Sequence, residues 1–150
     1  MSDAQVPVVE ATDRGDRAAV RALLDRAALP SSDLSDATRV QLWVVRDGQR
    51  VIGAIGLESF GTTGLLRSLV VSEDARGRGL GGVLVASLEG FARAAGVAEL
   101  VLLTQTAEQF FAGRGYAVIA RANAPAVVLE SSEFKSLCPA SAVCMSKRLA

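Results

Sequence analysis

The chain has 150 residues, half of them hydrophobic, so it is long enough to bury a core of its own. We expect a single domain over residues 1–150. Sixteen basic and sixteen acidic residues cancel, which argues against nucleic acid or an anionic membrane as the main partner. The sequence has no histidine and two cysteines, Cys138 and Cys144. Histidine-based acid–base catalysis and histidine-ligated metal sites are therefore excluded, and no resident metal is expected.

Short connections join apolar segments with strand or helix periodicity along the whole chain. The expected strands cover residues 6–11, 41–46, 50–59, 63–71, 100–104, 116–121 and 142–149. The expected helices cover residues 13–27, 80–95, 107–112 and 125–132, with a short helix or loop over 33–39. Asp47-Gly48 predicts a hairpin, and Gly96 is placed to cap the helix that carries Leu80, Leu84, Leu88 and Phe91 at helical spacing.

The most informative segment runs from Leu66 to Gly82, where an apolar strand leads into a basic, glycine-rich turn and then into a helix. Glycines let the backbone wrap closely around an anion, and the first N–H groups of a helix favour negative charge. Arg76 and Arg78 add two positive charges. The segment predicts a site for a pyrophosphate group.

Two common pyrophosphate motifs fit this turn poorly. Gly77-x-Gly79-x-x-Gly82 has the spacing of a dinucleotide fingerprint, but that motif also needs an acidic residue ending the next strand. Here the next strand ends on Thr104-Gln105. A phosphate-loop NTPase would need Gly-Lys-Ser/Thr, which is absent. An NAD-dependent oxidoreductase is therefore a disfavoured alternative.

With the spacing Arg76-x-x-Gly79-x-Gly81 after a Leu-x-Val strand, the turn resembles the acetyl-CoA signature of the GNAT superfamily of N-acetyltransferases. A second segment, from Ala107 to Tyr116, is similar to that superfamily's fourth-helix region, in which paired aromatic residues precede a Gly-aromatic step. The resemblance covers residues 6–121 and the last strand. It implies an α/β (α+β) fold with a mixed, mostly antiparallel sheet of six to seven strands, whose fourth and fifth strands splay apart around acetyl-CoA.

The resemblance also implies the reaction and its cosubstrate. The chain would transfer the acetyl group of acetyl-CoA to the amine of a small molecule by direct attack in a ternary complex. The residues implied to contact acetyl-CoA are Leu69, Val70, Val71, Arg76, Gly77, Arg78, Gly79, Leu80, Gly81, Gly82, Thr104 and Phe111. A backbone N–H near Leu69 would stabilise the oxyanion.

The candidate acid and base each have a structural alternative. Many members of the superfamily place a tyrosine beside the sulfur, where this chain has Phe111, which cannot protonate a thiolate. Tyr116 either supplies the acid in place of that tyrosine or is a packing residue at the start of a strand. Glu58, at the end of the third strand, is the candidate general base and would act through one water. The alternative is that Glu58 is a solvated acid at the end of a hairpin.

Two residues of the fourth strand are candidate substrate contacts. Arg67 suits a carboxylate or another oxyanion of the acceptor if it points into the acceptor pocket, and is surface charge if it points outward. Ser68 follows it directly. Regular strand alternation would place the two side chains on opposite faces, so that both could not project into one pocket.

A closer resemblance lies in the tail from Glu133 to Met145, together with Leu66-Arg-Ser-Leu and Phe110-Phe111. These segments look like the small acetyltransferases encoded in arsenic-resistance operons, which implies a context of arsenic or xenobiotic resistance. In this tail Ser136 and Cys138 are candidate substrate contacts. Cys138 and Cys144 either bind trivalent arsenic as soft thiolates or are small buried hydrophobic residues.

Several questions stay open on sequence alone. The alternative to an enzyme is a non-catalytic module that binds acyl-CoA or an arsenical. The acceptor amine is not identified, and a homodimer is one possible assembly. No apolar run approaches the length of a membrane span, and the amino terminus lacks a basic region followed by an apolar one. We therefore expect a cytoplasmic protein without a membrane partner.

Overall fold

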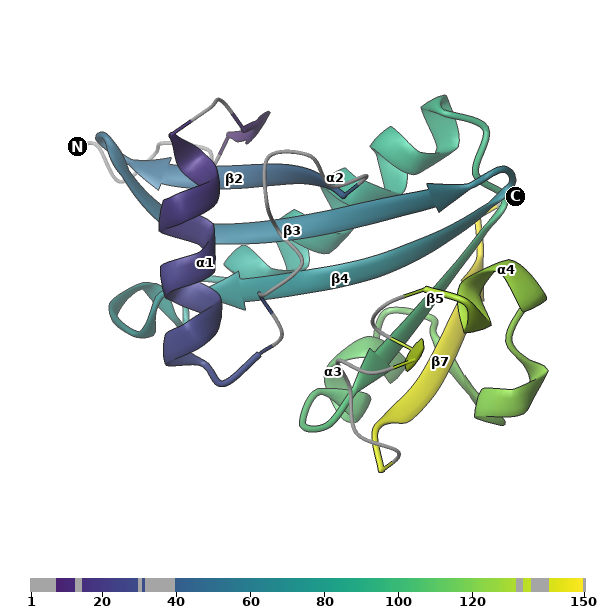
Figure 1. The fold of residues 1–150 in the computed structure, drawn as a ribbon. Coiled ribbons are helices and arrows are strands. Elements are labelled where there is room, and N and C mark those ends of the chain that lie inside the picture. The colour runs from purple at the N-terminus through teal and green to yellow at the C-terminus, as the bar shows by residue number, and fades with distance from the viewer. Residues whose placement is uncertain are drawn as a thin grey trace. The chain divides into compact units, whose positions relative to one another are not determined.

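The computed structural model describes residues 8–12, 15–29, 31, 40–131, 134–135 and 141–149. The strands are β1 (Val9–Ala11), β2 (Gln41–Asp47), β3 (Arg50–Phe60), β4 (Thr63–Val71), β5 (Glu99–Thr104), β6 (Ala117–Ile119) and β7 (Val143–Arg148). The helices are α1 (Asp16–Arg26), α2 (Leu80–Ala94), α3 (Glu108–Ala112) and α4 (Ala126–Leu129), with short 3-10 helices at Glu73–Ala75 and Arg121–Asn123. These elements follow the expected order (Figure 1). Asp13, proposed as a helix start, and residues 33–39 lie outside the described residues.

The seven strands form one sheet in the order β1-β2-β3-β4-β5-β7-β6. The pairs β1–β2, β5–β7 and β6–β7 are antiparallel, whereas β4 and β5 are parallel. The parallel ladder is short, because it pairs only residues 63–65 with residues 99–101. The prediction of a mixed, mostly antiparallel sheet flanked by helices is confirmed.

Contacts between Cα atoms divide the chain into two compact units. The first comprises residues 1–56 and 68–89, and the second comprises residues 57–67 and 90–150. Each unit has a hydrophobic cluster of its own, described below. The expectation of a single domain over residues 1–150 stays a prediction.

In the first unit, α1 lies across one face of β2 and β3 (Figure 1). Its apolar stripe enters the cluster made of Val20, Leu23, Leu24, Val40, Leu42, Val44, Val51, Ala54 and Val70. Helix α2 packs against β3 where the strand has Gly53, since a Cβ there would lie 3.2 Å from Leu84 Cδ1. At the β2–β3 hairpin, Gly48 takes the left-handed conformation (φ +64°) that the tight turn requires.

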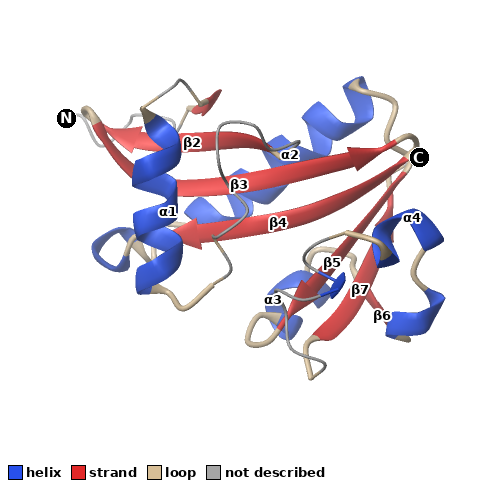
Figure 2. Cartoon of the chain, viewed as in Figure 1, coloured by secondary structure: helices blue, strands red, loops and turns tan. Residues whose placement is uncertain are grey.

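In the second unit, β5 and β7 run side by side (Figure 2) and pair over the full length of β5. The centre of β5, Leu100 to Leu102, is buried throughout, as expected for a strand covered on both faces. The cluster here consists of Leu65, Val101, Ala124, Val128, Phe134 and Cys144. The last helix, α4, is shorter than the predicted segment 125–132.

Helix α2 ends at the predicted glycine cap, but its buried face differs from the prediction at one residue. Gly96 has φ +89°, and the N–H of Val97 donates to the carbonyl of Ala92 at 2.9 Å. Phe91, expected on the apolar stripe, is 37% exposed, whereas Ala92 is fully buried. The interior position at this end of the helix is therefore occupied by Ala92 instead of Phe91.

Candidate active site

Strand β4 is irregular at Ser68, which has φ +61°. A left-handed residue other than glycine is uncommon and turns the chain away from a regular pleat. The premise of regular alternation is therefore wrong here, and the argument that it separates Arg67 from Ser68 does not hold.

Arg67 and Glu58 form a buried ion pair within the second unit. The side chain of Arg67 is fully buried, which excludes the alternative that it is surface charge. Its Nη1 lies 3.6 Å from Oε1 of Glu58, whose side chain is 14% exposed. This distance is too long for a hydrogen bond.

Among the described residues, Oε1 of Glu58 is a buried acceptor that receives no donor. Buried polar atoms are nearly always satisfied, so an exception calls for a water, a ligand or a catalytic role. The ion pair of Arg67 and Glu58 therefore leaves one oxygen of Glu58 able to accept a proton or a hydrogen bond from a bound molecule.

The predicted pyrophosphate turn follows β4 in the first unit. Gly77 and Gly79 take left-handed φ values of +85° and +76°, and no atom lies within 4 Å of a Cβ added at either position. Helix α2 then begins at Leu80, and the N–H of Val83 donates to the carbonyl of Gly79 at 3.2 Å. The N–H groups of residues 80–82 precede that bond and have no partner within the helix. They can donate to an anion, as the sequence predicts.

The aromatic residues of the α3 region form a stacked group in the second unit. Phe111 is buried and makes edge-to-face contacts with Phe110 and Tyr116, at centroid distances of 5.1 and 5.4 Å. Nζ of Lys147 lies 5.4 Å from the centre of the Tyr116 ring. The packing role of Tyr116 is therefore established, and its role as an acid stays a prediction.

Thr104, an implied cofactor contact, has a structural role as well. Its Oγ1 accepts a hydrogen bond from the N–H of Ala107 at 3.0 Å. This bond closes the turn between β5 and α3. The sequence alone did not indicate this use of the hydroxyl.

Cys144 is a buried residue of the second unit's hydrophobic cluster. Burial raises the pKa of its thiol, and the positive charge of Arg121 opposes this shift more weakly. A buried thiol kept in its neutral form is a poor arsenic ligand, because the thiolate is the species that binds. Ser136 and Cys138 lie outside the described residues.

Within the described residues, no group of three or more His, Cys, Asp or Glu side chains could hold a metal ion.

A model of the acetyltransferase (GNAT) family matches residues 11–117. The chain belongs to this family. The glycine-rich turn lies inside the matched segment. No curated protein matches the chain. Among the described residues, no helix has the length and apolar character needed to cross a membrane.

Solved structures share the fold of this GNAT-family chain at low sequence identity. N-acetylglutamate synthase from Neisseria gonorrhoeae, complexed with coenzyme A and N-acetylglutamate, is 19% identical with a TM-score of 0.80 over 97% of the chain. The chain spans only 36% of that protein's length. Rv2747 from Mycobacterium tuberculosis, in complex with CoA and NLQ, is 24% identical with a TM-score of 0.80, covering 96% of this chain and 100% of its own. GCN5 from Tetrahymena is 14% identical with a TM-score of 0.76, covering 97% of each chain.

Proposed function

We propose that this GNAT acyltransferase moves the acetyl group of acetyl-CoA to the amine of a small molecule. Family membership supports the reaction class. The cosubstrate is supported by the left-handed glycine turn at the start of α2 and by CoA in the complexes of two proteins with the same fold. The unsatisfied Oε1 of Glu58 is the single observation that carries the catalytic part of the proposal.

Each part of the cosubstrate has proposed contacts. Backbone groups of Leu69, Val70 and Val71 bind the pantetheine arm as an added strand would. The N–H groups from Gly77 to Gly82 bind the pyrophosphate, and the exposed guanidinium of Arg78 adds positive charge. Thr104 and Phe111 remain proposed contacts by resemblance.

The chemistry needs a base, an oxyanion donor and an acid. Glu58 accepts a proton from the acceptor ammonium through one water. The neutral nitrogen then attacks the thioester carbonyl carbon, and the N–H of Leu69 stabilises the resulting oxyanion. The C–S bond breaks, and the CoA thiolate takes a proton from Tyr116 or leaves as the thiolate.

Arg67 narrows the class of acceptor. The fully buried guanidinium of Arg67 lies beside the Glu58 carboxylate, and guanidinium groups bind carboxylates in a bidentate manner. We therefore propose an acceptor that carries a carboxylate or another oxyanion besides its amine, with Ser68 as a further contact. Ser136 and Cys138 are proposed substrate contacts on resemblance alone.

The biological context rests on sequence resemblance. The tail and the Leu66-Arg-Ser-Leu segment support a role in arsenic or xenobiotic resistance. The buried Cys144 speaks against arsenic held by a pair of thiolates. The assembly is a separate proposal. A homodimer is one possible assembly, and size-exclusion chromatography with light scattering tests it.

The deciding experiment combines binding with turnover. Calorimetric titration with acetyl-CoA is followed by an acceptor screen of amino acids and arsenical amines, in which the free CoA thiol is detected. Glu58→Gln is expected to lower kcat/KM by about 100-fold with little change in acetyl-CoA affinity. Binding without turnover across the panel would favour the non-catalytic acyl-CoA module, and an unchanged kcat/KM in Glu58→Gln would remove its assignment as base.

A further inference from the structure

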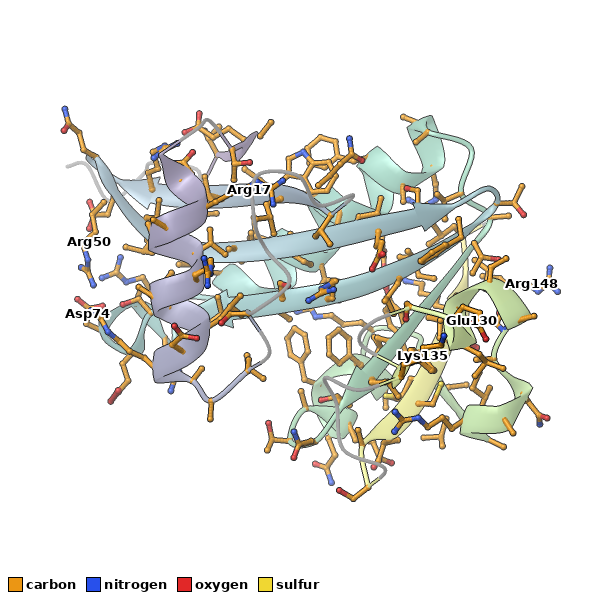
Figure 3. All side chains as sticks on the ribbon, in the orientation of Figure 1. Arg17, Arg50, Asp74, Glu130, Lys135 and Arg148 are labelled. Carbon is orange, nitrogen blue, oxygen red and sulfur yellow. The ribbon has the colours of Figure 1, made fainter. Side chains whose placement is uncertain are left out.

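Arg50, the first residue of β3, is bonded to the chain just before the pyrophosphate turn. Its Nη1 donates to Oδ2 of Asp74 at 2.9 Å, and its Nη2 donates to Oδ1 at 2.8 Å. The same Nη2 donates to Oγ of Ser72 at 2.9 Å. Figure 3 shows Arg50 and Asp74 pointing toward one another. Such a fork fixes both the distance and the orientation of the two groups.

Ser72 gives this segment two more bonds. Its N–H donates to the carbonyl of Ile52 at 2.7 Å, which extends the pairing with β3 by one residue beyond the end of β4. Its hydroxyl donates to Oδ1 of Asp74 at 2.5 Å. Ser72 is buried, so water cannot easily replace these bonds.

Arg76 holds the other end of the segment. Its Nε donates to the carbonyl of Val71 at 3.2 Å, and its N–H donates to the carbonyl of Glu73 at 3.4 Å. Ala75, between these bonds, is buried. Residues 72–76 are thus fixed to β3 and to the end of β4.

The fixed segment matters because the two glycines that follow it, Gly77 and Gly79, have no side chains to hold them. Gly77 and Gly79 are exposed, and no side chain restricts their left-handed conformations. Glycine loses more conformational freedom on ordering than any other residue. A turn that starts from a fixed anchor loses less of that freedom when an anion binds, which raises the affinity.

We propose that Arg50 is a positioning residue for the pyrophosphate of the acyl donor, acting through Asp74 and Ser72 without touching the cosubstrate. The inference rests on the proposed function, since it presupposes that the turn binds acetyl-CoA. The Arg50 guanidinium, with help from the Ser72 hydroxyl, holds the pKa of Asp74 below its usual range. The anchor therefore stays ionised throughout the neutral pH range.

Acetyl-CoA affinity of matched variants tests the proposal. In calorimetric titration, Arg50→Ala is expected to raise the Kd about fivefold. Arg50→Lys keeps the charge and loses the fork, so it restores only part of the affinity. Glu10→Gln is the control, because Oε1 of Glu10 accepts a bond from Nε of Arg46 at 2.6 Å in the same unit, far along the chain from the turn. Its Kd is expected to match that of the wild type.

A truncated donor separates positioning from general damage. S-acetyl-pantetheine has the thioester but no pyrophosphate. Arg50→Ala should therefore leave kcat/KM for this donor unchanged and lower kcat/KM for acetyl-CoA. Equal losses with both donors, or an Arg50→Ala Kd equal to that of the wild type, would overturn the inference. A wild-type protein that does not bind acetyl-CoA would instead overturn the proposed function itself.

A double-mutant cycle tests the route through Asp74. If Arg50 acts through this carboxylate, Asp74→Asn weakens acetyl-CoA binding, and adding Arg50→Ala to it weakens binding by much less than fivefold further. Fully additive losses would show that Arg50 does not act through Asp74, which the proposal requires, and would overturn it.

Discussion

Gly64 in β4 allows the close approach of neighbouring side chains in the second unit. A Cβ added there would lie 2.8 Å from Leu57 Cδ1, 3.0 Å from Leu100 Cδ2 and 3.2 Å from Val97 Cγ1. All three neighbours are almost fully buried, so none can swing out into solvent. Gly64→Ala is therefore expected to overpack the site and to destabilise the protein by about 1–3 kcal/mol.

The same substitution at Gly90 is the matched control. Gly90 lies inside α2, and no atom lies within 4 Å of a Cβ added there. Alanine at this position lowers the entropy of the unfolded chain without a clash, so Gly90→Ala is expected to stabilise by about 0.5–1 kcal/mol. One methyl group thus has opposite effects at the two glycines.

Urea unfolding followed by circular dichroism measures both changes. Thermal melts should agree, with a shift of about 2–4 °C for each kcal/mol in a chain of this size. If Gly64→Ala were as stable as the wild type, the inference that an added methyl group overpacks the start of β4 would be wrong. A destabilised Gly90→Ala would show that α2 is not a regular exposed helix at that position.

Three further predictions concern the candidate site and its surroundings. Tyr116→Phe keeps the ring stack and removes only the hydroxyl, so a role as the acid predicts a loss in kcat of about tenfold or more, whereas an unchanged kcat leaves Tyr116 a packing residue. Arg67→Ala should raise the KM of a carboxylate-bearing amine far more than that of a neutral amine, and equal effects on the two acceptors would contradict carboxylate binding. Burial raises the pKa of the Cys144 thiol in the folded state above its value in the unfolded chain. Its contribution to stability is thus complete below the unfolded-state pKa and is lost as the pH rises through the folded-state pKa. Urea unfolding from pH 7 to 10 should show this decline in the wild type and a smaller one in Cys144→Val.

The site combines groups that the sequence marked with groups that it did not. The glycine turn at the start of α2 was predicted from the order of residues alone. The ion pair of Glu58 with Arg67 was not, although both residues had been chosen separately as candidates. Their proximity changes how each is interpreted, because the guanidinium that would bind a substrate anion lies beside the proposed base.

The sequence by itself determined the features that depend on neighbouring residues. The turn from Arg76 to Gly82, the β2–β3 hairpin and the cap at Gly96 follow from glycine's access to left-handed φ values and from helix-end geometry. The order of strands and helices follows from hydrophobic periodicity. Because these signals are local, they are readable without knowledge of the tertiary structure.

Only the tertiary structure decided the features that join distant residues. The left-handed Ser68 depends on what packs around β4, and the burial of Ala92 in place of Phe91 depends on the space beside α2. Arg50 and Asp74 meet because the start of β3 lies beside the chain that follows β4. The two residues are 24 positions apart in the sequence, so no local pattern indicated that their charges would pair. Burial, pairing and strain are properties of the assembled chain, and no local pattern encodes them.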